Sequence, residues 1–315
     1  MTSRTIQENS IRSPFFYVGD KYKLMPQLKR LFPNKIKTYI EPFVGGGSSF
    51  LNIKAKQYLL NDINPYLINL HLFLQTQSQQ KILDSLFQVI EDYNLSCSIK
   101  NIIPPLDLRA TFKKTYFAKY NKESYLRLRN DFNQNKNDMV RLYLLLIYGF
   151  NRMLRFNSKG DFNLPVGNVD FNANVIQALK DYCHFVQDIP ISFFNLHYAE
   201  FLESVQMDDG DFIYLDPPYL ISDSEYNKLW SESSEMELYR ILNSLNDKGI
   251  QWGISNLLCH KRKYNRILEK FANRYETHII QSNYISFNDN SIKKDSVEVY
   301  VTNVKKKRTI QNSLF

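Results

Sequence analysis

The sequence predicts a mixed α/β fold with a largely parallel sheet and an inserted helical unit. Short apolar runs alternate with helical patterns before residue 63 and after residue 189. Such alternation is typical of a parallel sheet with crossover helices. Between residues 64 and 148 the pattern is helical and contains no convincing strand. We therefore expect a sheet-bearing domain of residues 1–63 and 189–315 and a mainly helical domain of residues 64–188.

The individual elements follow from local periodicity and from the polar, proline and glycine residues that bound each run. Strands are expected over residues 39–40 with their flanks, 57–61, 189–194, 211–215, 250–255 and 275–281. Helices are expected over residues 124–129, 139–147, 235–245 and 261–271. Residues 151–167 are polar and contain glycine, which favours a hairpin or loop within the helical domain.

The composition favours a polyanionic partner and argues against a disulfide-bonded or zinc-binding protein. The 315 residues carry a formal net charge of +8. This charge suits a nucleic acid, although a merely basic soluble protein would look the same. Three widely spaced cysteines form no C-x-x-C pair, and five histidines suggest no metal cluster. With no stretch of about 20 apolar residues, a cytoplasmic protein without a membrane segment is expected.

A glycine turn follows the first expected strand. Gly45, Gly46 and Gly47 would let a nucleotide-like ligand approach the backbone closely, although a purely structural turn is equally compatible. A dinucleotide fingerprint would need a further glycine at position 50, which is Phe50. No G-K-[ST] sequence follows, so a phosphate-binding P-loop is also excluded.

An acidic residue, Asp62, ends the second expected strand, 21 positions after Glu41. An acidic side chain about 20 positions after a glycine turn can accept hydrogen bonds from a ribose. Alone, Asp62 would more often cap a helix. Together with the glycine turn, it predicts a pocket for an adenosine-type cofactor.

The loop Asp216-Pro217-Pro218-Tyr219 directly follows an expected strand. Two prolines fix the backbone φ angles and exclude a helix, so the Asp216 carboxylate and the Pro217 carbonyl are held in one geometry. These two acceptors suit the two hydrogens of an adenine amine, and the Tyr219 ring can stack on a base extruded from a duplex. A rigid surface turn is the alternative.

Taken together, these motifs resemble those of the Dam-type adenine-N6 DNA methyltransferases, the α-group with the D12 signature. The phage Dam branch looks nearest. Residues 16–21 resemble the amino-terminal cofactor motif, residues 41–47 the glycine motif, and Asn61-Asp62 the acidic ribose motif. Residues 216–219 match the catalytic motif unaltered. The order of the motifs is that of this group, and the match covers nearly the whole chain.

The resemblance implies a Rossmann-like class I S-adenosylmethionine-dependent methyltransferase sheet with an inserted helical target-recognition domain. The implied enzyme is a site-specific, adenine-specific DNA methyltransferase (EC 2.1.1.72) that produces S-adenosylhomocysteine and needs no metal. Tyr17 replaces the tryptophan of some relatives but keeps an aromatic face. The implied catalytic residues are Asp216, Pro217, Pro218 and Tyr219. The residues implied to contact the cofactor are Tyr17, Lys21, Glu41, Phe43, Gly45, Gly47, Asp62 and Asp216.

Residues 155–167 resemble the family's recognition hairpin, whereas residues 95–117 have no clear counterpart in the family. Arg155 would form a bidentate contact with a guanine edge, worth about 1–3 kcal/mol of discrimination, and a phosphate contact is the alternative. The hairpin resembles that of enzymes acting on GATC, with other GAT-containing sites as the alternative. The residues implied to bind DNA are Phe150, Arg152, Arg155, Asn157, Lys159 and Pro165, of which Arg152 and Lys159 would meet phosphates.

Two rival functions differ from this reading at identifiable positions. Cytosine-N4 enzymes usually carry Ser in place of Asp216, and RNA or protein-glutamine enzymes usually carry Asn there. A catalytically inactive DNA-binding relative should show a damaged glycine turn or catalytic loop. The expected partner is double-stranded DNA, with the target adenine flipped out, and the expected state is a monomer or weak dimer. As the modification half of a restriction system, the chain would act beside a separate restriction endonuclease; a phage enzyme and a solitary regulator are the alternatives.

Overall fold

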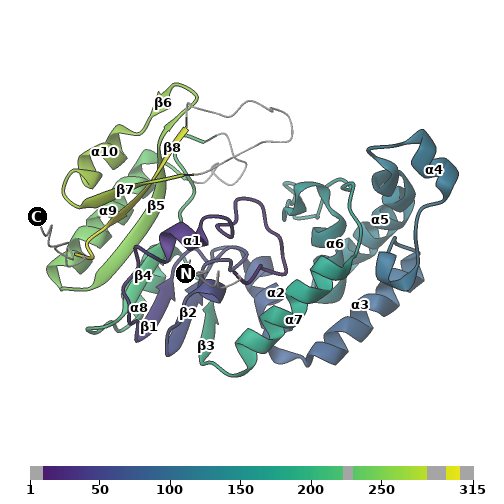
Figure 1. Cartoon of the computed structure of the whole chain (residues 1–315), viewed down its shortest axis with the longest axis horizontal. Coiled ribbons are helices and arrows are strands. Elements are labelled where there is room, and N and C mark those ends of the chain that lie inside the picture. Colours follow the sequence, from purple (N-terminus) through teal and green to yellow (C-terminus); the bar gives the residue numbers. More distant parts are fainter. Residues whose placement is uncertain (1–9, 223–229, 282–295, 306–315) are drawn as a thin grey trace, which may run out of the picture. The chain divides into compact units, whose positions relative to one another are not determined.

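Helices dominate one part of the chain and strands the other, as Figure 1 shows. The structure is a computed structural model that describes residues 10–222, 230–281 and 296–305. Its contacts divide the chain into two compact units, each assembled from three segments. The first unit comprises Met1–Met25, Val44–Ile53 and Asn61–Leu196, and the second comprises Pro26–Phe43, Lys54–Leu60 and His197–Phe315.

The first unit is mainly helical. Its long helices are α2 (Pro65–Thr76), α3 (Gln79–Tyr93), α5 (Tyr116–Gln134), α6 (Met139–Tyr148) and α7 (Ala173–Gln187), with a short α4 (Leu106–Thr111). Single 3₁₀ turns lie at η1 (Phe50–Asn52), η2 (Ser98–Lys100) and η3 (Phe150–Arg152), and strand β3 (Ile191–Phe194) closes the unit.

Polar side chains explain where these helices begin. Asn64, Ser78, Asp138 and Asn172 each precede a helix and accept a hydrogen bond from a backbone N–H of its first turn, which satisfies a donor that the helix leaves free. Helix α6 is largely apolar apart from Arg141 in its first turn, and residues 142–148 are all buried. It packs against α2, α3 and α5 and forms the centre of the unit.

The second unit contains most of the sheet. Its strands are β1 (Thr38–Glu41), β2 (Gln57–Asn61, whose last residue belongs to the first unit), β4 (Phe212–Leu215), β5 (Gln251–His260), β6 (Lys263–Tyr264), β7 (Glu276–Ile280) and β8 (Ser296–Thr302). Its helices are α8 (Tyr198–Ser204), α9 (Glu232–Asp247) and α10 (Arg266–Ala272), and α1 (Met25–Leu28) begins at the boundary between the units.

The strand order in this unit is β2-β1-β4-β5-β8-β7. The pairs β2-β1, β1-β4 and β4-β5 are parallel, whereas β8 and β7 add antiparallel pairs and β6 forms a small hairpin with β5. The expected mixed α/β fold with a mostly parallel sheet is therefore confirmed. Parallel pairing brings the carboxyl ends of β1 and β4 to the same edge of the sheet, where β1 ends at Glu41 and β4 leads into Asp216.

Aromatic side chains fill both faces of this sheet. On one face, the Phe32 ring lies 4.9 Å from that of Phe212, 5.0 Å from that of Tyr214 and 5.6 Å from that of Tyr300. On the other face, α9 and α10 contact β5, and Phe271 of α10 stacks on Trp252 at 5.6 Å. Burial of such rings on both faces explains why these strands are continuous apolar runs.

Gly253, on β5, faces the Tyr300 ring on the neighbouring strand β8. A Cβ atom at position 253 would lie 1.9 Å from the Tyr300 hydroxyl oxygen, far inside van der Waals contact. Tyr300 is fully buried, so its ring occupies the space that a side chain at position 253 would need. The absence of a side chain at Gly253 therefore leaves room for the Tyr300 ring over β5.

The expected elements are found with several differences in extent. Strand β5 extends to His260, beyond the predicted end at residue 255. The helix predicted over 261–271 is wrong at its start, because Lys261 and Arg262 adopt left-handed φ angles of 46° and 67° and β6 follows them. Asn265 then caps α10 by accepting from the Leu268 N–H, so the helix begins at Arg266. The periodicity predicted no strand where β6 and β8 lie.

Candidate active site

The Asp216 loop begins directly after β4, whose four residues are all buried. The Tyr219 hydroxyl donates to Asp216 Oδ1 at 2.9 Å and also lies 3.2 Å from Glu298 Oε1 on β8. The Tyr219 carbonyl accepts from the Ser222 N–H at 3.0 Å, which closes the loop behind the ring. The structure thus joins the Asp216 carboxylate to the Tyr219 hydroxyl, and the catalytic role of residues 216–219 stays a prediction.

Glu298 was missed by sequence reasoning as a member of this site. Its side chain is 1% exposed, although it carries a carboxyl group. A phenol has one hydrogen to donate, so the Tyr219 hydroxyl can donate to Asp216 or to Glu298 but not to both at once. The signal in the sequence was a single carboxylate within the apolar run of residues 297–301. A buried charged residue in such a strand usually has a specific partner.

An aromatic cluster lies beside the end of β1 in the second unit. The Phe43 ring lies 5.3 Å from that of Tyr198 and 5.8 Å from that of Trp230. The Tyr198 hydroxyl donates to Glu237 Oε2 at 2.6 Å, and burial raises the pKa of this phenol. Phe43 therefore has a packed, half-buried position that suits a flat ring of a ligand.

Asp62 holds the glycine turn in the first unit. Its Oδ2 accepts from the Gly45 N–H at 3.0 Å and its Oδ1 from the Asn64 N–H at 2.9 Å. The helix cap itself is Asn64, not Asp62. Burial raises the Asp62 pKa, and the two backbone bonds oppose the rise. Each carboxylate oxygen has two lone pairs, so Asp62 keeps acceptor capacity for ribose hydroxyls.

The backbone of the glycine turn is open on one side and closed on the other. Gly45, at φ 51°, has no atom within 4 Å of the place where a Cβ would stand. Gly47, at φ 80°, has the Phe50 ring 2.4 Å from that place. A Cβ at Gly46 would lie 2.8 Å from the Tyr17 Cβ, so Tyr17 packs on the turn. This open backbone beside an aromatic ring fits a nucleoside cofactor.

His71, on α2, supports the same turn and was also missed from the sequence. Its Nε2 lies 2.9 Å from the Gly45 carbonyl oxygen and its Nδ1 lies 2.8 Å from the Tyr182 hydroxyl. A carbonyl can only accept, so Nε2 carries the hydrogen and Nδ1 accepts from Tyr182. Burial lowers the pKa of His71 to about 4. A histidine on an apolar helix face looks like any core residue, and the sequence offers no signal for its contact with Gly45.

Two more predicted cofactor residues are buried charged groups. Glu41, the last residue of β1, is 2% exposed, and Lys21 is 5% exposed. The Lys21 carbonyl accepts from the N–H groups of Leu24 and Met25, which starts α1. Within the described part of the chain, no group of three or more His, Cys, Asp or Glu residues could hold a metal ion.

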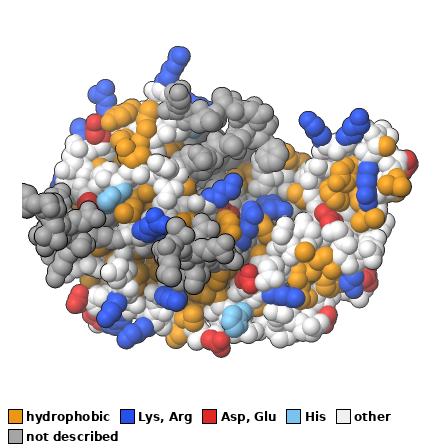
Figure 2. Space-filling view, in the orientation of Figure 1, with side chains coloured by type: hydrophobic (Ala, Val, Ile, Leu, Met, Phe, Trp, Pro, Cys, Tyr) orange, Lys and Arg blue, Asp and Glu red, His pale blue; other side chains and the backbone are white. Residues whose placement is uncertain are grey.

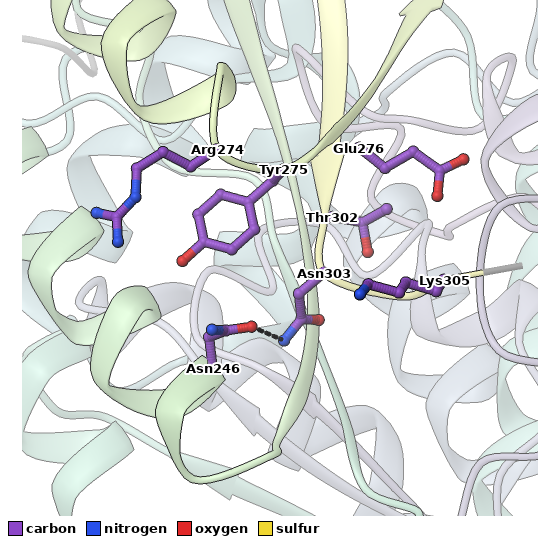
Figure 3. A pocket seen from close by; sticks show the side chains of 7 residues that line it. All are labelled: Asn246, Arg274, Tyr275, Glu276, Thr302, Asn303 and Lys305. Atoms are coloured by element: carbon purple, nitrogen blue, oxygen red, sulfur yellow. Dashed lines mark hydrogen bonds between the residues drawn. The ribbon is translucent and has the colours of Figure 1, made fainter.

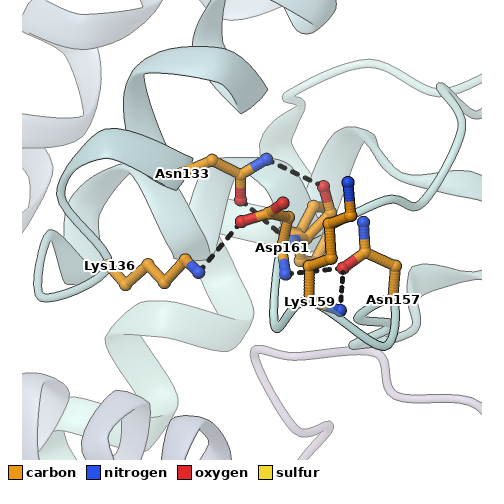
Figure 4. Close-up of polar contacts among 6 residues, drawn as sticks. Asn133, Lys136, Asn157, Lys159 and Asp161 are labelled. Carbon is orange, nitrogen blue, oxygen red and sulfur yellow. Dashed lines mark hydrogen bonds and ion pairs between the residues drawn. The ribbon is translucent and has the colours of Figure 1, made fainter.

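The expected hairpin is present as antiparallel bridges between Gly149 and Val166 and between Phe156 and Phe162. Asn157 folds its tip, because Asn157 Oδ1 accepts from the N–H groups of Lys159 and Asp161, both at 2.9 Å. Figure 4 shows how the Asn157 oxygen points back into the tip, while the Lys136 ammonium pairs with Asp161 at 3.0 Å. The Asn157 oxygen is therefore used within the hairpin, and the predicted contact of Asn157 with DNA stays a prediction.

Arg155 is held within the hairpin by Asn163. Its Nε donates to Asn163 Oδ1 at 2.9 Å, and one terminal nitrogen donates to the Asn163 carbonyl at 2.8 Å. The plane of the guanidinium is thus fixed while the remaining N–H groups of its two terminal nitrogens can meet a ligand. Such orientation is needed for a bidentate contact with a base.

The remaining predicted DNA-binding residues lie at or near the surface. Phe150 is 52% exposed, and Lys159 and Pro165 are exposed. Figure 2 shows Lys and Arg side chains spread over much of the visible face. Arg152 is different, because its guanidinium is partly buried over the Phe16 ring.

A separate pocket of about 380 Å³ lies in the second unit, near the first residues of β5 (Figure 3). Strands β4 and β5 are parallel, so this end of the sheet is opposite to the one where β4 leads into Asp216. The pocket carries charges of both signs and bears no predicted site residue. It is lined by Asn246, Arg274, Tyr275, Glu276, Thr302, Asn303 and Lys305.

Comparison with known proteins gives a consistent family. The sequence model described as "D12 class N6 adenine-specific DNA methyltransferase" matches residues 17–288. The chain is 32% identical over 307 residues to a modification methylase, StsI, of Streptococcus sanguinis, which covers 94% of this chain and 43% of the relative. It is 31% identical over 301 residues to the type II methyltransferase M.FokI of Planomicrobium okeanokoites, covering 93% and 43%.

A DNA adenine methylase of Vibrio cholerae is 33% identical over 208 residues, which cover 64% of this chain and 63% of that protein. The chain thus spans less than half the length of the two modification methylases. None of the described helices is both long enough and apolar enough to cross a membrane.

Proposed function

Because the chain belongs to the D12 class N6 adenine-specific DNA methyltransferases, we propose that it transfers a methyl group from S-adenosylmethionine to N6 of an adenine in double-stranded DNA. The observation that carries the proposal is the hydrogen bond of 2.9 Å between Tyr219 and Asp216 at the end of β4. This bond holds two groups together: a carboxylate that can accept from the adenine amine and an aromatic ring that can stack on the base.

The chemistry follows from the groups in this loop. The target adenine leaves the duplex and stacks on the Tyr219 ring. Asp216 and the Pro217 carbonyl accept hydrogen bonds from the two N6–H groups, which favours a pyramidal nitrogen and frees its lone pair to attack the methyl carbon. The new N–C bond forms as the C–S bond breaks, and Asp216 holds the departing N6 proton. Positioning and electrostatics supply most of the rate.

The first unit carries residues suited to the methyl donor. S-Adenosylmethionine supplies an electrophilic methyl group on a sulfonium sulfur. Asp62 would accept from its ribose hydroxyls, and the open backbone at Gly45 would admit its nucleoside. Tyr17 offers an aromatic face beside the turn. The other proposed cofactor residues are Lys21 and Gly47 of the first unit and Glu41, Phe43 and Asp216 of the second unit.

Target choice and setting extend this proposal. We propose that Arg155 reads a guanine in GATC or in another GAT-containing site, because Asn163 holds its guanidinium plane. The similarity to two modification methylases supports a role in a restriction system beside a separate endonuclease. The sheet-bearing domain of 1–63 and 189–315, the recognition domain of 64–188, a cytoplasmic location and a monomeric or weakly dimeric state complete the proposal.

The test is methyl transfer from labelled S-adenosylmethionine to four duplexes: GATC, GATC with 2-aminopurine for adenine, GATATC and a scrambled site. Label in GATC alone supports the enzyme and the target, and label in GATATC corrects the target. Asp216→Ala should abolish transfer while leaving DNA binding, whereas the exposed control Asp209→Asn should stay active. Full activity of Asp216→Ala would reject the assigned role. No label in any of the four duplexes would reject DNA as the substrate and favour RNA, a protein or a binding role without catalysis.

A further inference from the structure

Two arginines from distant parts of the first unit contact one aromatic ring. The Arg12 guanidinium carbon lies 4.5 Å from the centroid of the Phe16 ring, and that of Arg152 lies 4.4 Å from the same centroid. Arg152 comes from the η3 turn, 136 residues further along the chain than Phe16. We call these three residues the Arg12–Phe16–Arg152 cluster. Arg12 is exposed, so an ion in solution can reach it.

The backbone is strained on both sides of this contact. Phe16 has φ 48°, Asn151 has φ 56° and Arg152 has φ 50°, and all three are L-residues in the left-handed region. This region is sparsely populated by residues other than glycine because the Cβ atom crowds the backbone. Strained residues of this kind gather at functional sites, where the surrounding structure holds them in place.

The electrostatics of the cluster are also unfavourable without a further ion. Arg152 Nε is buried and has no hydrogen-bond partner. Burial lowers the pKa of Arg152, and the like charge of Arg12 lowers it further. In the described ranges, neither guanidinium has a carboxylate within ion-pair distance. Asp20 is the acidic group that acts on both, and Lys21 and Lys23 lie close to it, so positive charge is in excess.

We infer that the Arg12–Phe16–Arg152 cluster binds a phosphate group of the DNA backbone. Guanidinium groups present paired N–H donors that match phosphate oxygens, and stacking on a ring fixes their planes while leaving the edges open. An anion would offset the repulsion between the two cations. We assign the anion to DNA because Arg152 lies in the sequence between Phe150, which is 52% exposed, and Arg155 of the hairpin, both of which are proposed to bind DNA. This inference rests on the proposed function for its substrate.

The contact would position the duplex without reading its sequence. Among the residues assigned by sequence, Arg152 was expected to meet phosphate, whereas Arg12 and Phe16 had no assigned role in DNA binding. The structure therefore adds the segment just before Tyr17 to the DNA-binding surface. A phosphate can reach the exposed side chain of Arg12 from solvent, and the half-buried Arg152 offers it a hydrogen-bond donor in a fixed position.

The experiment measures affinity for a fluorescent GATC duplex and a scrambled duplex by anisotropy between 50 and 300 mM KCl, without requiring catalysis. The double variant Arg12→Gln/Arg152→Gln should lose one phosphate contact. Its slope of log K against log salt should be shallower by about 0.9, with a roughly tenfold loss of affinity near 0.1 M salt. The loss should be equal on both duplexes. Lys81→Gln/Lys180→Gln, which removes the same charge from exposed sites on α3 and α7, should keep the wild-type slope.

A conservative variant separates ion binding from folding. The single variant Arg152→Lys keeps the charge but not the planar fork of the guanidinium. Its slope of log K against log salt should equal that of the wild type, while its affinity for DNA stays below that of the wild type. Slopes equal to wild type in the double variant overturn the site. A loss confined to S-adenosylmethionine affinity, measured by calorimetry, also overturns it, because the anion would then be a carboxylate of the donor. If the double variant shows the expected change in slope but the wild-type protein transfers no methyl group, only the proposed function is rejected.

Discussion

Acid should destabilise the first unit through His71. The neutral ring donates from Nε2 to Gly45 and accepts at Nδ1 from Tyr182, and its pKa is lowered to about 4 by burial. The unfolded chain would titrate near the ordinary value of 6.5. Because the folded pKa is the lower one, the unfolded state takes up a proton first as pH falls.

The stabilising contribution of neutral His71 is therefore complete above pH 6.5 and is lost as pH falls toward 4. Each pH unit within this window costs about 1.4 kcal/mol, so the free energy of unfolding should fall by about 2 kcal/mol between pH 6.5 and pH 5. The full loss near pH 4 is about 3 kcal/mol. A loss of this size is a large fraction of the stability of an ordinary protein.

Urea unfolding at pH 8, 6.5, 5.5 and 5 would measure this contribution. His71→Gln does not titrate, so its stability should be lower at pH 8 but should fall less steeply with acid than that of the wild type. His184→Gln removes an exposed histidine from α7 and should keep the wild-type slope. Parallel curves for wild type and His71→Gln between pH 6.5 and pH 5 would refute the reasoning.

Substitutions at three further positions test the candidate site and its support. Gly47→Ala should remove S-adenosylmethionine binding in calorimetry, because a Cβ there would lie 2.4 Å from the Phe50 ring at a left-handed φ; affinity within twofold of wild type would contradict this. Glu298→Ala should lower kcat about tenfold by removing an acceptor near the Tyr219 hydroxyl, worth about 1.5 kcal/mol. Glu298→Gln keeps an acceptor oxygen and should retain most activity, so equal defects in both variants would argue against this role. Glu235→Ala should cost about 3–5 kcal/mol in urea unfolding, because four buried or partly buried donors lose their acceptor, and a loss below about 1 kcal/mol would count against that network.

The local sequence pattern was sufficient to predict most strands of the sheet. The runs at β1, β2, β4 and β7 have the length and the apolar content of strands, and the structure contains a strand at each of them. The glycine turn and Asp62 were paired from spacing alone, and Gly45 does donate to Asp62 at 3.0 Å. These features depend on residues close in sequence or on a topology in which neighbouring strands end at one edge.

Contacts between distant elements could not be read in the same way. His71 reaches Gly45 from the second turn of helix α2, and Glu298 reaches Tyr219 from a strand 79 residues later. Each depends on how elements pack, and neither leaves a local pattern. The turn at Lys261 and Arg262 was missed for a different reason. Charged residues are good helix formers, and the left-handed conformation of this pair belongs to the two-residue hairpin turn between β5 and β6, in which both central residues have positive φ.

The close approach of Gly253 and Tyr300 has a consequence for how the sequence can change over time. Any side chain at position 253 would collide with the Tyr300 phenol, so Gly253 cannot be replaced while Tyr300 is present. Loss of the ring at position 300 would first have to open the space, at the cost of a buried cavity. Substitutions at the two positions can therefore occur only in a fixed order. Tyr300 must be replaced by a smaller residue before Gly253 can be replaced by a larger one.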